Sequence, residues 1–299
     1  MGRLRQFAER CYERLLLAEL SETPSHVAVI QDGNRRYAAS RGDDPADGHR
    51  AGAETTQRLL RWCDELGIEE VTLYAFSTEN FARPPDEREA IFDLAAEKLR
   101  EFAESEQIQA AGVRIRAIGE TDRLPERVRE AVAYAEQQTA DNDTHRLNVA
   151  LAYGGRTELL AAARDIATRV EAGGLDPDDI DVDTVEAALY DGPTRDVDLI
   201  VRSGGDERTS NFLPWQANGN EAAVYFSAPY WPAFRKIEFL RGIRTHGARE
   251  GGGTRNRMRR LRTAVGAVAA TALDTGPFDW LGAGVTGDTG DDPDAGTAD

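Results

Sequence analysis

Two polar segments follow strand-like apolar runs and carry the residue types that handle diphosphates. Asp32–Arg36 follows the run His26–Gln31, and Ser203–Ser210 follows the run Leu199–Arg202. Glycines let a backbone approach phosphate closely, arginine forks match its oxygens, and a carboxylate such as Asp32 is a suitable Mg²⁺ ligand. Ligands of open α/β sheets bind beyond the carboxyl ends of the strands, so both segments are predicted to face one site.

A third apolar run, Val71–Phe76, also ends in polar residues, among them Asn80 and Arg83. Each segment has an ordinary structural alternative. Asp-Gly followed by Asn is typical of a hairpin turn, Ser77-Thr with a later Pro is typical of a helix start, and the second arginine segment also fits a surface loop. No Walker A sequence is present and no GxGxxG follows the first run, which disfavours nucleotide folds.

The elements that must position these residues alternate strand and helix along the chain. The predicted strands are His26–Gln31, Val71–Phe76, Val113–Ile118, Leu147–Ala152, Leu199–Arg202 and Ala222–Phe226. The predicted helices are Gly48–Leu66, Glu87–Ser105, Pro125–Gln138, Thr157–Glu171, Val182–Tyr190 and Pro232–Arg244, and a Gly- and Asp-rich loop is predicted to lead to Gly48. This order predicts an α/β fold: a single domain with a mostly parallel central sheet of about six strands, flanked by helices.

Composition narrows the class of protein. The 299 residues carry a formal net charge of -17 and include only two lysines, which indicates adaptation to high salt or, alternatively, an acidic protein from a GC-rich genome. Such a surface argues against nucleic-acid binding, which needs a basic stripe. No apolar stretch is long enough to span a bilayer, and two cysteines without a metal or disulfide spacing fit a reducing cytoplasm.

Three segments are predicted along the chain. Residues 1–22 form an amphipathic helix, which either packs on the domain or touches a membrane. Residues 23–253 form the catalytic domain. Residues 254–299 hold a basic cluster followed by an acidic, Gly- and Asp-rich tail, whose composition is typical of disorder.

Several motifs, in order, resemble the cis-prenyltransferase family of the undecaprenyl diphosphate synthase type, including the archaeal tritrans,polycis-undecaprenyl diphosphate synthases. The resemblance covers Ser25 to Gly253. Its motifs are His-Val-Ala-Val-Ile-x-Asp-Gly-Asn-Arg-Arg, Gly-His-x-x-Gly-Ala, Leu-Tyr-Ala-Phe-Ser-Thr-Glu-Asn, Ala-Tyr-Gly-Gly-Arg and Arg-Ser-Gly-Gly-x-x-Arg-x-Ser-Asn-Phe-Leu-x-Trp-Gln. The resemblance implies Z-selective, Mg²⁺-dependent addition of isopentenyl diphosphate to an allylic diphosphate primer.

The same resemblance implies roles for individual residues. Asp32 would hold Mg²⁺ on the allylic diphosphate, and Asn80 would accept the proton. The allylic diphosphate and its surroundings would be bound by Gly33, Asn34, Arg35, Arg36, Tyr37, His49, Ser77, Thr78, Glu79, Phe81 and Arg83. Isopentenyl diphosphate would be bound by Arg202, Arg208, Thr209 and Ser210. The implied metal ligands are Asp32 and Glu221.

The chain departs from the family pattern at a few positions. Gln31 replaces a usual Met or Pro, Tyr37 replaces a Trp, and Pro45 stands where many bacterial members have a phosphate-binding Arg. The spacing from Glu221 to Tyr225 is two residues longer than usual, so counting from Tyr225 points to Ala223 instead. Residues 249–251, Arg-Glu-Gly, resemble a family motif that reaches across a dimer, or else a flexible glycine linker.

The sequence therefore predicts an enzyme that makes a long polyprenyl diphosphate carrier lipid. The primer is geranylgeranyl or farnesyl diphosphate, and the acidic composition together with the related archaeal enzymes favours geranylgeranyl. A homodimer in the cytoplasm is expected, with peripheral membrane contact for product release. The alternative is a non-catalytic subunit of a heteromeric cis-prenyltransferase, but such subunits generally lose the Asp32 motif and the paired arginines, which this chain keeps.

Overall fold

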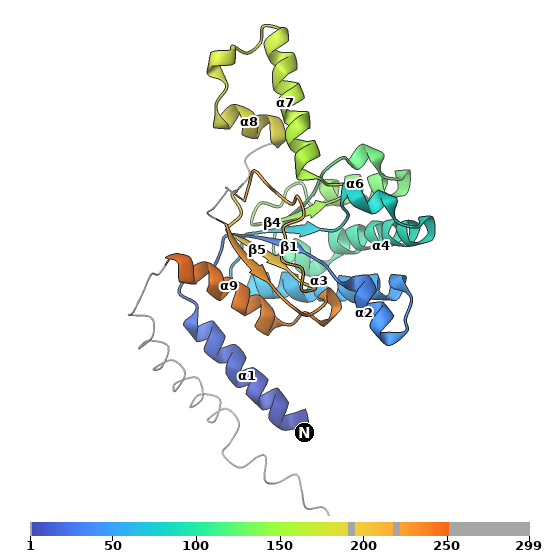
Figure 1. The fold of residues 1–299 in the computed structure, drawn as a ribbon, viewed down its shortest axis with the longest axis vertical. Helices are drawn as coiled ribbons and strands as arrows, with labels where there is room; N and C mark the ends of the chain where they lie inside the picture. Colours follow the sequence, from blue (N-terminus) through green and yellow to red (C-terminus); the bar gives the residue numbers. More distant parts are fainter. Residues whose placement is uncertain (1, 191–194, 218–221, 251–299) are drawn as a thin grey trace, which may run out of the picture. The chain divides into compact units, whose positions relative to one another are not determined.

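A six-stranded parallel sheet forms the centre of the unit that spans Leu20–Gly252 (Figure 1). The computed structural model describes residues 2–190, 195–217 and 222–250. The strands stand in the order β3-β4-β2-β1-β5-β6, and every neighbouring pair is parallel. They are β1 His26–Ile30, β2 Glu70–Tyr74, β3 Val113–Ile118, β4 His145–Ala150, β5 Leu199–Arg202 and β6 Ala223–Phe226. The predicted α/β fold with a six-stranded parallel sheet is confirmed.

Helices connect the strands and supply most of the core. They are α2 Asn34–Arg41, α3 Pro45–Glu65, α4 Pro85–Glu104, α5 Glu106–Ala110, α6 Glu126–Gln138, α7 Gly155–Glu171, α8 Val182–Leu189 and α9 Lys236–Glu250. Short 3₁₀ turns lie at η1 Thr78–Ala82, η2 Thr121–Arg123, η3 Pro177–Asp179 and η4 Trp231–Ala233. Helices α7 and α8 pack on each other as a hairpin that projects away from the sheet (Figure 1).

The two faces of the sheet differ because strand side chains alternate between them. Val27 and Val29 of β1 face a large apolar core that includes side chains from α3, α4, α6 and α9. Ala28 and Ile30 belong to a smaller cluster on the other side, which contains Phe212 from the loop after β5. The helices therefore cover one face, and loops cover much of the other.

Helix α2 lies where the sequence predicted only a Gly- and Asp-rich loop leading to Gly48. Its eight residues lack an apolar period, which is why the sequence did not indicate a helix. Glycines at both ends define it: Gly33 has φ 100° at the N-cap and Gly42 has φ 78° at the C-cap, conformations that glycine adopts without strain. The site therefore gains a helix N-terminus directly after β1.

Helix α1 (Gly2–Glu19) belongs to a separate unit of the structure. The helix predicted within residues 1–22 is thus present. Among the described residues, no helix is long and apolar enough to cross a membrane. The basic cluster and acidic tail predicted at 254–299 lie outside the described residues.

The order in which the strands are added to the sheet reverses between β1 and β5. From β1 it first builds β2, β3 and β4 on one side, and then crosses to β5 and β6 on the other. Ile30 at the end of β1 stands in register with Arg202 at the end of β5. Such a switch point leaves a crevice outside the strand ends, and both predicted diphosphate segments begin there.

Candidate active site

The loop after β1 presents the N-terminus of α2 to the crevice. Gly33 is required there, because a Cβ on it would lie 2.6 Å from the Tyr230 ring. The helix has no side-chain capping hydrogen bond at its start, and the first turn carries Arg35 and Arg36 and no acidic residue. A helix N-terminus with two arginines forms a favourable place for a diphosphate.

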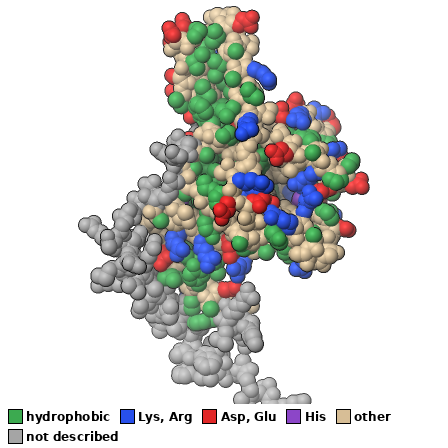
Figure 2. Space-filling view, in the orientation of Figure 1, with side chains coloured by type: hydrophobic (Ala, Val, Ile, Leu, Met, Phe, Trp, Pro, Cys, Tyr) green, Lys and Arg blue, Asp and Glu red, His purple; other side chains and the backbone are tan. Residues whose placement is uncertain are grey.

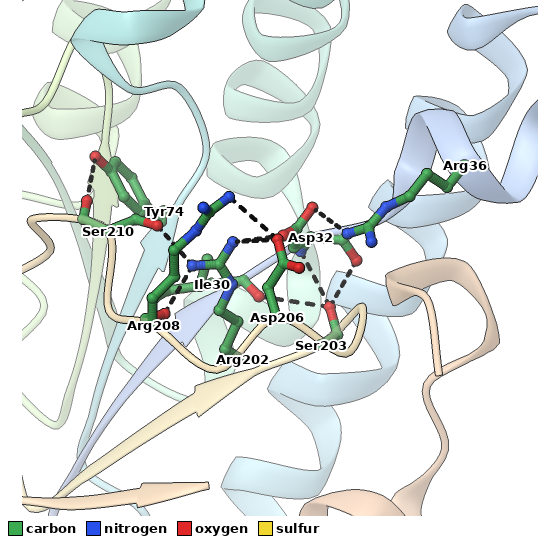
Figure 3. Close-up of polar contacts among 9 residues, drawn as sticks. All are labelled: Ile30, Asp32, Arg36, Tyr74, Arg202, Ser203, Asp206, Arg208 and Ser210. Carbon is green, nitrogen blue, oxygen red and sulfur yellow. Dashed lines mark hydrogen bonds and ion pairs between the residues drawn. The ribbon is translucent and has the colours of Figure 1, made fainter. Parts of the chain in front are cut away.

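Asp32 lies at the centre of an ion-pair network at the switch point (Figure 3). Its Oδ2 accepts a hydrogen bond from Arg202 Nη2 at 2.6 Å, and its Oδ1 lies 3.0 Å from Arg36 Nη2. Burial opposes ionisation of this carboxyl, but the hydrogen bond and charge of Arg202, together with Arg36, lower the pKa of Asp32 overall. Asp32 is therefore ionised at neutral pH and still 27% exposed to the crevice.

Ser203 fastens the two strand ends together. Its hydroxyl donates to Asp32 O at 2.8 Å and accepts from Asp32 N at 3.0 Å, while its backbone N–H donates to Ile30 O at 3.3 Å. The loops after β1 and β5 are therefore held as one rigid edge, with Asp32 and Arg202 side by side.

Arg202 organises the loop after β5. Its side chain is only 4% exposed, and Nη1 donates to Arg208 O at 2.7 Å and to Ser210 Oγ at 2.6 Å. Asp206 Oδ2 lies 3.2 Å from both the Arg202 and Arg208 guanidinium groups. Arg208 itself is 70% exposed. Arg202 is thus fixed in the wall, whereas Arg208 is exposed and can exchange Asp206 for an incoming anion.

A second charged cluster lies between α3 and α4. Arg83 Nη1 donates to Glu87 Oε1 at 2.8 Å, and Glu87 also lies 3.7 Å from His49 and 3.6 Å from Arg35. Burial, with the Arg83 charge, lowers the pKa of His49 to about 4, so His49 is neutral at pH 7. A neutral imidazole can donate one hydrogen bond to a phosphate oxygen without adding charge.

Asn80 lies in the 3₁₀ turn η1 that follows β2. Its side-chain oxygen accepts a hydrogen bond from Ser77 N at 3.0 Å, and the Ser77 side chain accepts in return from the backbone of residue 80. This capping box fixes the Asn80 side chain at the cavity wall.

The crevice opens into one cavity of about 730 Å³ that changes from polar to apolar along its length. Its polar end appears in Figure 2 as arginine and carboxylate side chains gathered around a hollow. Its apolar end is lined by Leu73, Ile91, Leu94, Ala95, Leu99, Phe102, Val149 and Leu151, with Lys98 beside them. A ligand with a charged head and a long apolar tail fits this gradient.

The residues present fit a magnesium ion bound with a substrate. Mg²⁺ binds proteins through one or two carboxylates and completes its shell with water and phosphate oxygens. Asp32 offers such a carboxylate between two arginines that would hold the phosphates. Within the described residues, no three His, Cys, Asp or Glu side chains converge to hold a metal alone. Glu221, the second predicted ligand, lies outside the described residues.

The structure brings most of the predicted site residues to this cavity. Its lining includes Asp32, Gly33, Asn34, Arg35, Arg36, His49, Ser77, Glu79, Asn80, Arg83, Arg202, Arg208 and Ser210. Four others do not line it: Tyr37 lies under Arg41, Thr78 against Gly154, Phe81 on Phe76, and Thr209 in the β5 loop. Residues 249 and 250 end α9, and Gly251 is outside the described residues.

The sequence did not predict a role for two residues of the site. Asp206 balances both arginines of the β5 loop, and Ser203 ties that loop to Asp32. Asp206 carried a usable signal, since a carboxylate four residues after one arginine and two before another is placed to contact both. Ser203 carried none, because its partner is 171 residues away in the chain.

Comparison with known proteins places these features in context. Residues 30–252 match the prenyltransferase family described as "Putative undecaprenyl diphosphate synthase". The chain is 60% identical over 275 residues to the tritrans,polycis-undecaprenyl-diphosphate synthase (geranylgeranyl-diphosphate specific) of Haloarcula marismortui, covering 92% of this chain and 90% of that protein. The enzyme of the same name from Halobacterium salinarum is 59% identical over 268 residues, covering 90% of this chain and 89% of that one.

Solved structures agree with the sequence comparison. Lavandulyl diphosphate synthase from Lavandula x intermedia, in complex with dimethylallyl diphosphate, is 35% identical with a TM-score of 0.71, covering 77% of this chain and 98% of that one. A probable undecaprenyl diphosphate synthase from Campylobacter jejuni is 35% identical with a TM-score of 0.61, covering 78% and 98%.

Proposed function

The chain belongs to the undecaprenyl diphosphate synthase family of prenyltransferases, and we propose that it adds isopentenyl diphosphate units in Z geometry to geranylgeranyl diphosphate. The product is a long polyprenyl diphosphate that serves as a glycosyl carrier lipid. One observation carries the proposal: Asp32 and Arg202 join two oxyanion sites at the head of a single, increasingly apolar cavity. A non-catalytic subunit would have no use for this paired arrangement.

The loop after β1 suits the allylic diphosphate. The N-terminus of α2 and the side chains of Arg35, Arg36 and His49 can receive its phosphate oxygens. These groups stabilise negative charge as the diphosphate departs, which is where electrostatic catalysis acts. Asp32 would hold Mg²⁺ there, and the ion, when bound, neutralises charge on the leaving diphosphate.

The loop after β5 suits the diphosphate of isopentenyl diphosphate. Arg202 and Ser210 form its fixed floor, and the exposed Arg208, with Thr209 beside it, can close over the bound anion. Because Arg202 also touches Asp32, the two diphosphates would lie next to each other. This brings the alkene of one substrate to the allylic carbon of the other.

The reaction forms one carbon–carbon bond. The terminal alkene carbon of isopentenyl diphosphate attacks C1 of the primer while the C1–O bond breaks and diphosphate leaves. A proton is then lost from C2 of the added unit to set the new Z double bond. Asn80 lines the cavity and would accept this proton, and because an amide is a weak base it would relay the proton to a diphosphate oxygen.

A homodimer is part of the proposal. Leu160, Ile180 and Val182 on the α7–α8 hairpin are 56%, 40% and 61% exposed, and Figure 2 shows hydrophobic side chains gathered over this hairpin. Exposed apolar side chains in one place favour a protein contact, and a second copy of this chain is the occupant we propose. Light scattering should give twice the monomer mass, and Leu160→Asp with Val182→Asp should give the monomer.

We also infer a cytoplasmic enzyme that meets the membrane peripherally. The two cysteines are free in the structure, and α1 carries apolar residues at helical spacing. The long-tailed product must finally enter a bilayer. Flotation of the full chain with lipid vesicles tests this contact, and an enzyme that stays entirely in the vesicle-free fraction would contradict it.

Incorporation of radiolabelled isopentenyl diphosphate tests the main proposal. The purified protein would be assayed in high salt with Mg²⁺ and with primers of two to four isoprene units, followed by product sizing. We expect activity to be highest with geranylgeranyl diphosphate and to be lost with a chelator. Absence of incorporation with every primer would favour the non-catalytic subunit, and activity restored only by a partner protein would establish it.

A further inference from the structure

The segment Tyr153–Arg156, which begins α7, stands between two loops of the site. On one side, Tyr153 bridges to Ser77 and its carbonyl accepts from Thr78 N at 2.9 Å. On the other side, Gly155 N donates to Asn211 O at 2.9 Å and Arg156 N donates to Asn211 Oδ1 at 2.9 Å. The start of α7 therefore holds both the η1 turn and the end of the β5 loop.

The two glycines of this segment exist because the packing is tight. A Cβ on Gly154 would lie 2.8 Å from Thr78 Oγ1. A Cβ on Gly155 would lie 2.2 Å from Pro214 and 2.8 Å from Asn211 O. A side chain at Gly155 would run into Pro214 and the Asn211 backbone, and one at Gly154 would force Thr78 to turn, so the start of α7 rests closely against both loops.

The turn that Asn211 belongs to is strained. Ser210, Asn211 and Leu213 have φ of 50°, 60° and 47°, the left-handed region that non-glycine residues rarely adopt. Such a run persists only when its surroundings hold it, and it tends to occur where function requires it. Asn tolerates this region better than most residues, which makes Asn211 the natural anchor of the turn.

The strained turn sets the position of a substrate-binding group. Ser210 Oγ accepts from Arg202 Nη1 at 2.6 Å, and Ser210 O accepts from Tyr74 Oη at 3.5 Å. The Tyr74 ring stacks on Phe212 with centroids 4.4 Å apart, and Tyr153 meets Phe212 edge-on. Asn211 does not line the cavity, so whatever it does for the reaction it does through Ser210 and Arg202.

We propose that Asn211 is a positioning residue for the isopentenyl diphosphate site, acting through its side-chain hydrogen bond to the N-terminus of α7. The inference rests on the proposed function. The side chain locks the strained turn, the turn presents the Ser210 hydroxyl, and Arg202 is thereby held in the geometry that receives a diphosphate. The arginines of the allylic site, Arg35 and Arg36, come from α2 and not from this turn.

Asn211→Gly is the direct test. Glycine adopts φ 60° without strain, so this variant removes the hydrogen bond to Arg156 N and little else. We expect the KM for isopentenyl diphosphate to rise roughly tenfold, as for the loss of one hydrogen bond. The KM for the allylic primer should stay within about twofold of wild type, because substitutions at separate sites act independently. Asn211→Asp keeps the acceptor oxygen and should restore most of the affinity.

Asn142→Gly provides the matched control. Asn142 Nδ2 donates to Val113 O at 2.9 Å, so this asparagine also braces backbone, but at a distance from the cavity lining. Its substitution should leave both KM values unchanged. If Asn211→Gly does not fold, Asn211→Ser carries the same expectation, because the shorter serine side chain lacks the amide oxygen that accepts from Arg156 N.

Different results would contradict the positioning role of Asn211 and the proposed function. A wild-type KM for isopentenyl diphosphate in Asn211→Gly, an equal rise in the KM for both substrates, or no rescue by Asn211→Asp would each overturn the positioning role. If wild type itself incorporates no isopentenyl diphosphate with any primer, the proposed function fails instead, and the variants are not needed to show it.

Discussion

The two strand-end loops that meet at the switch point are built in opposite ways. The loop after β1 offers a helix N-terminus and exposed arginines, with Arg35 56% and Arg36 43% exposed. The loop after β5 buries Arg202 to 4% exposure and braces it with Ser210 and a strained turn. The arginines of the β1 loop are thus exposed and adaptable, whereas Arg202 of the β5 loop is fixed before any substrate arrives and only Arg208 of that loop is exposed.

This difference matches the demands of processive chain growth. In the function we propose, the β1 loop releases diphosphate after each condensation and receives the lengthened chain, so exposed arginines that exchange ligands suit it. The β5 loop, in the same proposal, accepts the same small substrate each time, so a fixed floor lowers the ordering cost of binding. Asp32 joins the two, because its carboxylate contacts Arg202 and Arg36 at once.

Removing the Asp32 carboxylate should have the largest effect on activity, because this residue serves both loops. Asp32→Asn takes the counterion from both arginines and removes the only carboxylate we assign to Mg²⁺ among the described residues. We expect kcat to fall by at least about 10³-fold, since single preorganised groups contribute 10² to 10³-fold and Asp32 serves two sites. Isopentenyl diphosphate incorporation measures this, with Mg²⁺ varied. Asp43→Asn, an exposed carboxylate on the neighbouring loop, is the control.

A near-normal rate in Asp32→Asn would contradict the assigned role of this residue. A variant that no longer melts cooperatively would show that Asp32 serves the fold instead. We expect cooperative melting, because the side chain lies at the crevice and not in the core.

Matched arginine substitutions should sharpen the contrast between the loops. Arg202→Lys loses a buried guanidinium that makes four hydrogen bonds, and lysine cannot reproduce its planar fork. We expect kcat/KM for isopentenyl diphosphate to fall by about 10²-fold, in line with truncated buried charge pairs. Arg36→Lys, on the exposed loop, should lower kcat/KM for the primer by only about tenfold. Equal losses from both would remove the distinction between fixed and adaptable loops.

Glycine-to-alanine substitutions in the two loops should lower the free energy of unfolding by different amounts. Gly33→Ala combines φ 100° with a 2.6 Å approach to the Tyr230 ring, and should lower the free energy of unfolding by about 3 kcal/mol. Gly205→Ala has φ 80° but no atom closer than 3.8 Å, so backbone strain of about 1 kcal/mol should be its whole cost. Urea unfolding in high salt measures both. A larger loss in Gly205→Ala would show that space at Tyr230 is not limiting.

The sequence predicted the scaffold better than the supports of the site. Strands Val113–Ile118 and Leu199–Arg202 were predicted with their observed bounds, because apolar runs between polar loops carry a local signal. Helix α2 was missed because its residues have no apolar face. The bonds of Asn211 to the start of α7 and of Ser203 to Asp32 join segments 55 and 171 residues apart. No local pattern encodes such contacts, since tertiary packing creates them.

Glu158 of α7, beneath the fixed loop, gives the smallest predicted effect. It is half-buried and accepts a hydrogen bond from Tyr153 Oη at 2.6 Å, and burial raises the pKa of Glu158 to about 7 from an ordinary 4.5. The folded state therefore binds the proton more tightly than the unfolded state. Ionising Glu158 therefore lowers the free energy of unfolding. This loss is absent below pH 4.5, grows as pH rises, and is complete above pH 7. Between pH 5.5 and pH 8 it should cost about 2 kcal/mol of unfolding free energy.

Glu158→Gln should remove this loss, because glutamine accepts the Tyr153 hydrogen bond without titrating. Urea unfolding at pH 5.5 and pH 8 is the measurement, and the variant should gain on wild type as pH rises. Glu54→Gln, an exposed glutamate of α3, removes one carboxylate without touching Tyr153 and is the control. The gain should come without a change in primer KM, because neither Glu158 nor Tyr153 lines the cavity. A pH dependence identical in wild type and Glu158→Gln would mean that the carboxyl under the fixed loop titrates as it does in the unfolded chain.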